Sequence, residues 1–376
     1  MRNTLVCTVG TSLFSNLTFL NEKTNDKPLN WKLIKEHFMQ ERWAMLAEEL
    51  YKTNSPDIRL LGAEINTIEE AKKKNWLAIQ NLIFLVSDTE KGENTGKVLT
   101  KYFEKRKDLN LVNIEYIKIE KLQDQNPKEF KTTGLRNLVR VVGDIIQRFG
   151  AEQIAIDATG GYKAQIAVAV LIGQALKIPV YYKHELFSEI IDFPALPISL
   201  DYDILGKNAS LLSDFEKGYV FSSSEISKLD DKIKVFLDEI EEGGESIYEL
   251  NAIGQLYLTS FRLRYPKATR LKPLSQSERK KPTFGNDHHY PKGFKNFVQK
   301  VWEENNWIKT CWTIPYGGQG NIKGIGFNVR QEKEKNILVG HFKTDDFGAR
   351  FQLELSDNSI ESLIWVADYL NMKYKK

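Results

Sequence analysis

Five short apolar runs, rich in β-branched residues, recur in the first half of the chain and are separated by segments of helix length. They cover residues 4–9, 81–87, 112–117, 153–157 and 178–182. An apolar run without alternation is typical of a strand that is buried on both faces, as in a parallel sheet. Because strands that alternate with helices form right-handed βαβ units, the pattern predicts an α/β fold with a doubly wound, mostly parallel, Rossmann-like sheet over residues 1–205.

The alternation of strands and helices ends after Pro197, and two other patterns follow. Residues 206–270 contain helix-forming segments, the strongest of them at 230–242, and predict a helical connector. Residues 271–376 then combine two predicted helices with three predicted strands. The helices cover 291–305 and 359–372, and the strands cover 324–330, 336–343 and 350–355. We expect a small α+β domain in which an antiparallel sheet packs with helices.

A length of 376 residues suits two or three domains, each large enough to bury a core of its own. No apolar run approaches the roughly 20 residues of a membrane-spanning helix, and no signal peptide is evident. The two cysteines, Cys7 and Cys311, are too few for a disulfide framework or a metal cluster. We therefore expect a cytoplasmic protein without a membrane partner, a metal site or a bound cofactor.

Basic residues are concentrated in one part of the chain. Residues 266–343 contain 15 lysines and arginines against 6 acidic residues, a net charge of +9, whereas the whole chain carries +3. A basic block of this kind usually contacts a polyanion, although a solvated surface without a partner is the alternative. Nucleic acid is therefore the expected partner of the C-terminal domain.

Three loops with anion-binding chemistry follow predicted strands. They are Gly10-Thr11-Ser12, residues 87–92, and residues 157–163 with the sequence Asp-Ala-Thr-Gly-Gly-Tyr-Lys. Ligands of doubly wound sheets bind at the carboxyl ends of the strands, where glycines allow close approach and helix N-termini present N–H groups to anions. Each loop alone is also typical of an ordinary turn with a helix cap. The Walker spacing is absent, which disfavours ATP hydrolysis.

Taken together, these loops resemble the motifs of CARF domains, the CRISPR-associated Rossmann fold domains that bind cyclic oligoadenylates made by type III CRISPR complexes. The matching segments are residues 8–13, 63–68, 86–89, 157–163 and 193–197. The resemblance implies a homodimer that binds cyclic tetra-adenylate, the activator, on its two-fold axis. It also implies these ligand-binding residues: Gly10, Thr11, Ser12, Asp88, Thr89, Thr159, Gly160, Gly161, Tyr162 and Lys163.

Some CARF domains also cut their activator, and the residues that they use match Ser12 and Lys163. In that chemistry the ribose 2′-hydroxyl attacks the neighbouring phosphate without a metal ion. Ser12 would orient the phosphate and Lys163 would stabilise the developing negative charge. The alternative is that both residues only bind the ring.

The C-terminal domain lacks the motifs of two other effector classes. No arginine in the C-terminal half is followed by histidine at the Arg-x4–6-His spacing of HEPN ribonucleases. The segment Glu278-Arg279-Lys280 has the Glu-x-Lys spacing of metal-dependent PD-(D/E)xK nucleases. It lies in a segment punctuated by prolines rather than on a predicted strand, which disfavours that class.

The domain instead resembles the RelE family of ribosome-dependent mRNA endonucleases in size, element order, basicity and the hairpin at residues 337–351. RelE-like enzymes attack through the RNA's own 2′-hydroxyl and use clustered basic side chains. The resemblance implies Arg330, Lys343 and Arg350 as phosphate and transition-state stabilisers, Lys295 as an RNA contact, and His341 as acid or base. For each residue, a strand position without a catalytic role is the alternative.

The leading hypothesis is a cyclic tetra-adenylate-activated, metal-independent endoribonuclease of type III CRISPR immunity. It would cut mRNA at the ribosome and limit its own activity by ring cleavage. Two alternatives stay open. One is a ligand-controlled regulator that binds nucleic acid without cutting it, and the other is a metal-dependent CARF nuclease.

Overall fold

The structure, a computed structural model, describes residues 2–25, 27–53, 59–75, 77–184, 189–227, 229–266, 270–285, 289–314, 324–344 and 347–375. The chain forms two compact units. The N-terminal unit consists of Met1–Ser199 and Asn251–Leu263, and the C-terminal unit consists of Leu200–Leu250 and Arg264–Lys376. The segment predicted as a connector is divided between them. Within the described residues, no helix is long and apolar enough to cross a membrane.

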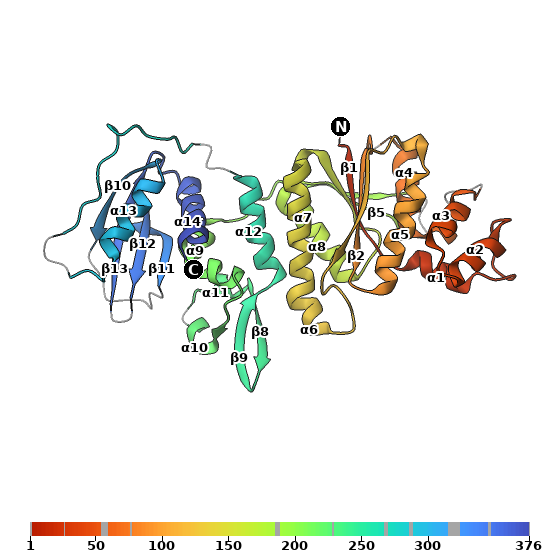
Figure 1. Cartoon of the computed structure of the whole chain (residues 1–376), viewed down its shortest axis with the longest axis horizontal. Coiled ribbons are helices and arrows are strands. Elements are labelled where there is room, and N and C mark those ends of the chain that lie inside the picture. The colour runs from red at the N-terminus through yellow and green to blue at the C-terminus, as the bar shows by residue number, and fades with distance from the viewer. Residues whose placement is uncertain are drawn as a thin grey trace. The chain divides into compact units, whose positions relative to one another are not determined.

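A six-stranded sheet in the order β3-β2-β1-β4-β5-β6 forms the centre of the N-terminal unit (Figure 1). Neighbouring strands pair in parallel, except that β6 pairs antiparallel with β5. The strands are β1 (Thr4–Thr8), β2 (Asn81–Ser87), β3 (Asn113–Ile119), β4 (Ile154–Asp157), β5 (Val180–Tyr182) and β6 (Ile191–Phe193). The predicted α/β fold with a mostly parallel sheet is confirmed, and the short edge strand β6 is an addition to it.

Helices cover both faces of this sheet, because its central strands are apolar on both sides. Leu5 and Cys7 of β1 belong to the core of one face, whereas Val6 belongs to the core of the other. Helices α4 and α5 lie along the first face, with α1, α2 and α3 packed outside them in the same core, and α7 and α8 lie along the second face, with α12 outside α7 (Figure 1). Their bounds are α1 (Ser12–Phe19), α2 (Trp31–Met39), α3 (Trp43–Tyr51), α4 (Gly62–Lys73), α5 (Glu90–Glu104), α7 (Leu135–Phe149), α8 (Lys163–Leu176) and α12 (Ala252–Arg264).

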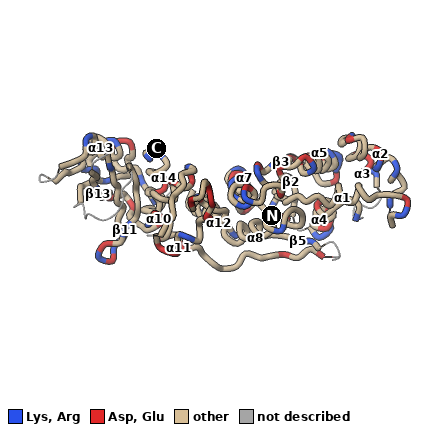
Figure 2. Tube along the Cα trace, turned by 90° about the horizontal axis from the view of Figure 1, so that it is seen from below, with Lys and Arg blue, Asp and Glu red and all other residues tan. Residues whose placement is uncertain are grey.

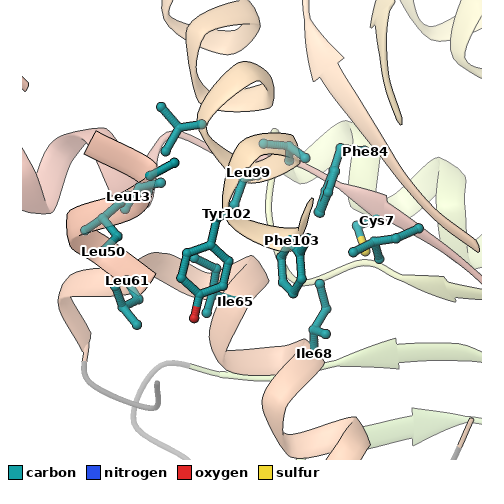
Figure 3. Packing of buried hydrophobic residues seen from close by; sticks show 14 of the residues in the cluster. Cys7, Leu13, Leu50, Leu61, Ile65, Ile68, Phe84, Leu99, Tyr102 and Phe103 are labelled. Carbon is teal, nitrogen blue, oxygen red and sulfur yellow. The ribbon is translucent and has the colours of Figure 1, made fainter. Parts of the chain in front are cut away.

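The core of the first face is rich in aromatic rings (Figure 3). Phe84 of β2 contacts Phe103 of α5 with 5.7 Å between the ring centroids, and Phe103 contacts Tyr102 at 5.1 Å. Burial of one such side chain contributes about 1.5–3 kcal/mol. Cys7 lies in the same core, and burial raises the pKa of its thiol. This packing holds β1 and β2 firmly beneath the loops that follow them.

A four-stranded antiparallel sheet in the order β10-β13-β12-β11 forms the centre of the C-terminal unit. Its strands are β10 (Ile308–Ile314), β11 (Ile325–Glu332), β12 (Lys335–Lys343) and β13 (Gly348–Leu355). The three strands that the sequence predicted are confirmed, and so are the two helices, α13 (Phe294–Glu304) and α14 (Ile360–Tyr374). Strand β10 is an addition, because its polar and aromatic residues do not show a clear alternation.

Helices cover this sheet and its β11 edge. Phe297 of α13 contacts Phe342 of β12 at 5.2 Å and Phe351 of β13 at 6.2 Å between ring centroids. Helices α14 and α9 (Asp203–Glu216) pack along β11. There the side-chain amide of Asn371 bonds to both the N–H and the C=O group of Phe327. These bonds satisfy main-chain groups that an edge strand would otherwise leave exposed.

Residues 237–250 form a β-hairpin where the sequence predicts helix. Strand β8 (Leu237–Glu242) pairs with β9 (Glu245–Leu250), and β7 (Phe221–Ser222) completes a small sheet in the order β7-β9-β8. Gly243 and Gly244 form the turn with φ of 61° and 85°, as a two-residue hairpin requires. The prediction of one helix over 230–242 is wrong. Of this segment only α11 (Asp231–Lys234) is helical, after the short α10 (Ser223–Ile226).

Candidate functional site

A pocket of about 650 Å³ lies at the carboxyl ends of β1, β4 and β5. Its walls include Gly10, Thr11 and Ser12 after β1 and Thr159, Gly160 and Gly161 after β4. Strands β1 and β4 are parallel neighbours, so the loops that follow them meet at the same edge of the sheet. The structure thus brings six of the predicted binding residues together.

The two loops touch through their main chains, an arrangement that requires glycine. A Cβ atom on Gly10 would lie 2.8 Å from the Gly161 nitrogen, and one on Gly160 would lie 2.6 Å from the Gly10 nitrogen. Gly161 also has a φ of 103°, which residues with side chains rarely adopt. The Thr8 hydroxyl donates to the Gly160 carbonyl at 2.5 Å. This part of the pocket wall is therefore main chain, which a ligand can approach closely.

Two helices begin at the pocket. Helix α1 begins at Ser12, and α4 begins at Gly62, and both of these residues line the pocket. The Ser12 Oγ accepts a hydrogen bond from the Ala63 N–H at 3.1 Å and still has a proton to donate to a ligand. Because helix N-termini carry a partial positive charge, this corner of the pocket suits an anion such as a phosphate.

Two buried carboxyl groups hold the loops. Glu64 of α4 accepts a hydrogen bond from the Gly10 N–H at 2.7 Å. Asp157 accepts from the N–H and the hydroxyl of Thr159 at 3.0 and 2.5 Å. Burial raises the pKa of each carboxyl to about 7, and the neighbouring Glu64 charge adds to the rise at Asp157. Glu64 Oε2 and Asp157 Oδ2 have no hydrogen-bond partner among the described residues. Near neutral pH these carboxyls are therefore partly protonated. Their hydrogen bonds are made with the loop after β1, at Gly10, and the loop after β4, at Thr159.

Arg59, Lys183 and His184 also line the pocket, and the sequence prediction does not include them. The Lys183 ammonium lies 3.9 Å from the Glu70 carboxylate, and both side chains are about 15% exposed. The Lys183 N–H donates to the Thr159 hydroxyl at 2.9 Å. Lys183 and His184 directly follow β5, so the same strand-end argument that identified the other loops could have found them.

Asp88 and Thr89 do not line the pocket, although the sequence places them after β2. Asp88 accepts a hydrogen bond from the Lys121 N–H at 2.9 Å, and it lies 3.6 Å from the Lys118 ammonium. Thr89 is the N-cap of α5 and accepts from the Gly92 N–H at 3.0 Å. In this structure both residues stabilise the start of a helix and its neighbouring loop.

Tyr162 and Lys163 lie at the start of α8 and are likewise absent from the pocket walls. The Tyr162 ring packs edge-on against Phe130 with 5.1 Å between centroids. Lys163 is the first residue of α8 and is exposed. A role for Lys163 in ring cleavage therefore requires a ligand that extends beyond this pocket.

In the C-terminal unit, Arg330, His341 and Arg350 lie close together on the sheet. His341 pairs with Arg350 across β12 and β13. Burial lowers the pKa of His341 to about 3, and the charges of Lys375, Arg330 and Arg350 add to this shift. A histidine with that pKa is uncharged at neutral pH and poorly matched to acid–base catalysis. His341 and Arg350 are 8% and 5% exposed, which leaves little surface for contact with RNA.

Lys343 lies two residues beyond His341 on β12, whereas Lys295 lies on α13. Lys343 ends β12 and lines a second cavity, of about 500 Å³. The Lys295 ammonium of α13 lies 5.5 Å from the ring centroid of Phe284 and 5.3 Å from that of Tyr290, a cation–π arrangement. The predicted effector residues are thus divided between the sheet and α13.

The structure is an α/β fold with a pocket whose lining suits an anion. Residues 59–196 match the model of a family described as CRISPR-associated protein (Cas_APE2256). The matched segment includes Glu70, the loop after β4, and Lys183, but not the loop after β1 or the C-terminal sheet. This match supports a CRISPR-associated protein.

Two further comparisons add little. No curated protein matches the chain. The solved structure of protein VC1899 from Vibrio cholerae matches over 94% of this chain and 77% of its own, with 7% identity and a TM-score of 0.24. A likeness at that level carries no argument about fold or function.

Proposed function

We propose that the N-terminal unit binds a cyclic oligoadenylate, with cyclic tetra-adenylate as the ring, and that this ligand activates the C-terminal unit as a metal-independent endoribonuclease. The observation that carries the proposal is the pocket where the loops after β1 and β4 meet the N-termini of α1 and α4. Main-chain N–H groups, the Ser12 hydroxyl and the Lys183 ammonium suit the phosphates of such a ring. The match to a CRISPR-associated family agrees with a ligand of this class.

Polar groups of the same pocket suit the adenine bases. Glu70, Asn16 and Asn66 line it and carry oxygen atoms that can accept from an exocyclic amino group. Tyr182 adds an aromatic ring to the wall, on which a base can stack. The mixture of anion donors and base acceptors favours a nucleotide over an inorganic anion.

We infer that the sensor is a homodimer. A ring of four identical nucleotides has two-fold symmetry, which two copies of the same pocket can match. Apolar side chains on α8 and β6 support a partner for this unit. Leu171 is 43% exposed, and Ile191 and Phe193 are each 38% exposed. A second copy of the chain would cover such surface.

The C-terminal unit is proposed to cut mRNA at the ribosome, because it contains the basic block of the chain. Lysine positions lie along α13 and in the turn between β11 and β12 (Figure 2). Basic side chains bind the phosphates of RNA and give contacts that weaken with salt. An attack by the RNA's own 2′-hydroxyl needs no metal ion, only positioning and stabilisation of charge.

Translation extracts provide the test. Full-length protein is added to an extract that translates a defined mRNA, with and without cyclic tetra-adenylate, and cleavage is mapped by primer extension. We expect cuts within the translated region only when the ring is present. Intact mRNA together with salt-sensitive RNA binding would support the regulator instead. Cutting of naked RNA that EDTA abolishes would support the metal-dependent nuclease.

A further inference from the structure

A second cavity, of about 500 Å³, lies in the C-terminal unit. It is formed by the end of α9 and the loop after it, the start of β11, the end of β12 and the end of α14. The residues on which the argument rests are Asp214, Tyr219, Phe342, Lys343, Tyr374 and Lys375. Its size is within the range of about 300–1,000 Å³ that is usual for small-ligand sites.

Aromatic rings form fixed walls of this cavity. Phe342 and Tyr374 both pack against Phe297, at 5.2 and 5.8 Å between ring centroids. The Tyr374 hydroxyl donates to Glu304 at 2.7 Å, which fixes the orientation of its ring. The aromatic core of the unit therefore holds two of the rings that a ligand would meet.

The rim of the cavity has exposed apolar surface. Tyr219 and Val220 line the cavity and are 50% and 49% exposed. The main chain fixes their position, because the Tyr219 N–H donates to the Asp214 carbonyl at 3.0 Å. An exposed tyrosine beside a cavity with aromatic walls is suited to stack on a planar group.

Two lysines line the cavity, one buried and one exposed. The Lys375 ammonium is buried and bonds to Asp214 at 2.6 Å and to the Ser210 hydroxyl at 2.7 Å. Lys343 is exposed at the end of β12, where its N–H donates to the Gly324 carbonyl at 2.9 Å. Lys375 therefore stabilises the fold at this point, and Lys343 is the cation that an anionic ligand can reach.

We propose that this cavity binds one nucleotide of a single-stranded RNA, with the base against Tyr219 and Phe342 and a phosphate on Lys343. The proposal rests on the ribonuclease function proposed above and names a substrate contact for it. An apolar ligand would make no use of Lys343 and Asp214, and a polyphosphate would make no use of the rings. A nucleotide uses both, and the Asp214 carboxylate can accept from a base amino group.

The experiment measures RNA binding by the full-length protein with cyclic tetra-adenylate present. The probe is a short fluorescein-labelled 2′-O-methyl RNA, which the proposed chemistry cannot cut, and the readout is fluorescence anisotropy at several salt concentrations. Tyr219→Ala and Lys343→Ala each remove one proposed contact. Phe347→Ala and Lys232→Ala are matched controls, since they remove an exposed ring and an exposed lysine of the same unit that do not line the cavity.

We expect Tyr219→Ala to weaken binding about tenfold with an unchanged salt slope, because it removes stacking and no charge. Tyr219→Phe should restore the affinity. Lys343→Ala should reduce the salt slope by about 0.7, the value for one phosphate contact on a single strand. The two control variants should bind within about twofold of the wild type.

A photo-crosslink gives a second readout that does not depend on a substitution. A 4-thiouridine probe bound to the wild type should crosslink to a peptide that contains Tyr219 or Tyr374. The inference is overturned if the wild type binds RNA, Tyr219→Ala and Lys343→Ala bind it equally well, and the crosslink lies elsewhere. The proposed function would stand in that case. If the wild type binds no RNA, with or without ribosomes, the proposed function fails as well.

Discussion

Two ligand-sized cavities of this chain, one in each unit, differ in whether main-chain or side-chain atoms form their walls. The pocket of the N-terminal unit is formed where main-chain atoms of two glycine-containing loops touch above the buried carboxyls of Glu64 and Asp157. The cavity of the C-terminal unit is formed by side chains from four separate elements. A main-chain contact has no room for an added atom, whereas a wall of side chains persists when one member is shortened. A single added atom should therefore abolish ligand binding in the N-terminal pocket, whereas shortening one side chain should only weaken ligand binding in the C-terminal cavity.

Gly160→Ala is the strongest test of this difference. Its Cβ atom would lie 2.1 Å from a Glu64 oxygen and 2.6 Å from the Gly10 nitrogen, so both loops must separate. We expect binding of cyclic tetra-adenylate, measured by calorimetry, to be lost, and the free energy of unfolding to fall by about 2 kcal/mol.

Gly244→Asn is a suitable control for that substitution. Gly244 has a φ of 85° and no atom of another residue within 4 Å of an added Cβ atom, and asparagine tolerates this conformation better than other residues do. The control should bind the ring as the wild type does. Wild-type affinity in Gly160→Ala would show that the main-chain contact does not shape the pocket.

Ser12→Ala tests whether the pocket also cuts its ligand. Ser12 lines the pocket and its Oγ is oriented by the Ala63 N–H, so its loss should slow ring cleavage in EDTA about 100-fold, the scale for one positioned donor. Chromatography of the products gives the rate. Lys163→Ala should slow cleavage similarly only if the bound ring extends to the start of α8. An intact ring after long incubation with the wild type would mean that both residues only bind.

Lys183→Ala should have a moderate effect that is confined to affinity. The Lys183 side chain lies in the pocket beside Glu70, so removal of its charge should weaken ring binding about tenfold, as for one charge-assisted hydrogen bond. The dependence of binding on salt should also decrease. Lys163→Ala is the matched comparison, because Lys163 is exposed and does not line the pocket. Equal losses in both variants would contradict the boundaries of the pocket described above.

The sequence predicts much of the N-terminal site because that site follows one physical rule. Parallel strands end at the same edge, and glycines mark the places where main chains approach each other, so the loops at Gly10 and Gly160 could be paired before the structure. Lys183 directly follows β5 and obeys the same rule. Asp88 also follows a strand, yet its carboxylate bonds to Lys121 instead of facing the pocket. The sequence indicates where a loop begins, but it does not determine which way each side chain points.

The C-terminal cavity could not be predicted in this way. Tyr219, Lys343 and Lys375 come from segments far apart in the chain, and they meet only because α9 and α14 pack along β11. Local composition was misleading in the same region, since the glutamate-rich segment before Gly243 suits a helix but forms the hairpin strand β8. The roles of Arg330, His341 and Arg350 rest on the resemblance to the RelE family, and burial separates His341 and Arg350 from solvent.

Glu64→Gln should give the smallest effect, a change in the dependence of stability on pH. The pKa of Glu64 is raised from 4.5 to about 7 in the folded chain, so the folded state binds this proton more tightly than the unfolded state does. The stabilisation from the bound proton is complete when the pH is below 4.5, the pKa of Glu64 in the unfolded chain. It is lost as the pH rises through about 7, the pKa in the folded chain. Glutamine keeps an oxygen for the Gly10 N–H and cannot ionise. Between about pH 5 and 8 the free energy of unfolding of the wild type should therefore decrease. The decrease for the Glu64→Gln variant should be smaller by on the order of 1–3 kcal/mol.

Denaturant unfolding of both proteins over this pH range measures the difference. Removal of the Glu64 charge should also lower the pKa of Asp157, because that charge contributes to its rise. Asp157→Asn should flatten the remaining slope further in the Glu64→Gln background, since burial still raises the pKa of Asp157 there. Parallel curves for the wild type and Glu64→Gln would mean that Glu64 does not titrate beneath the pocket. The Gly10 N–H would then bond to a Glu64 carboxyl whose protonation state does not change over this pH range.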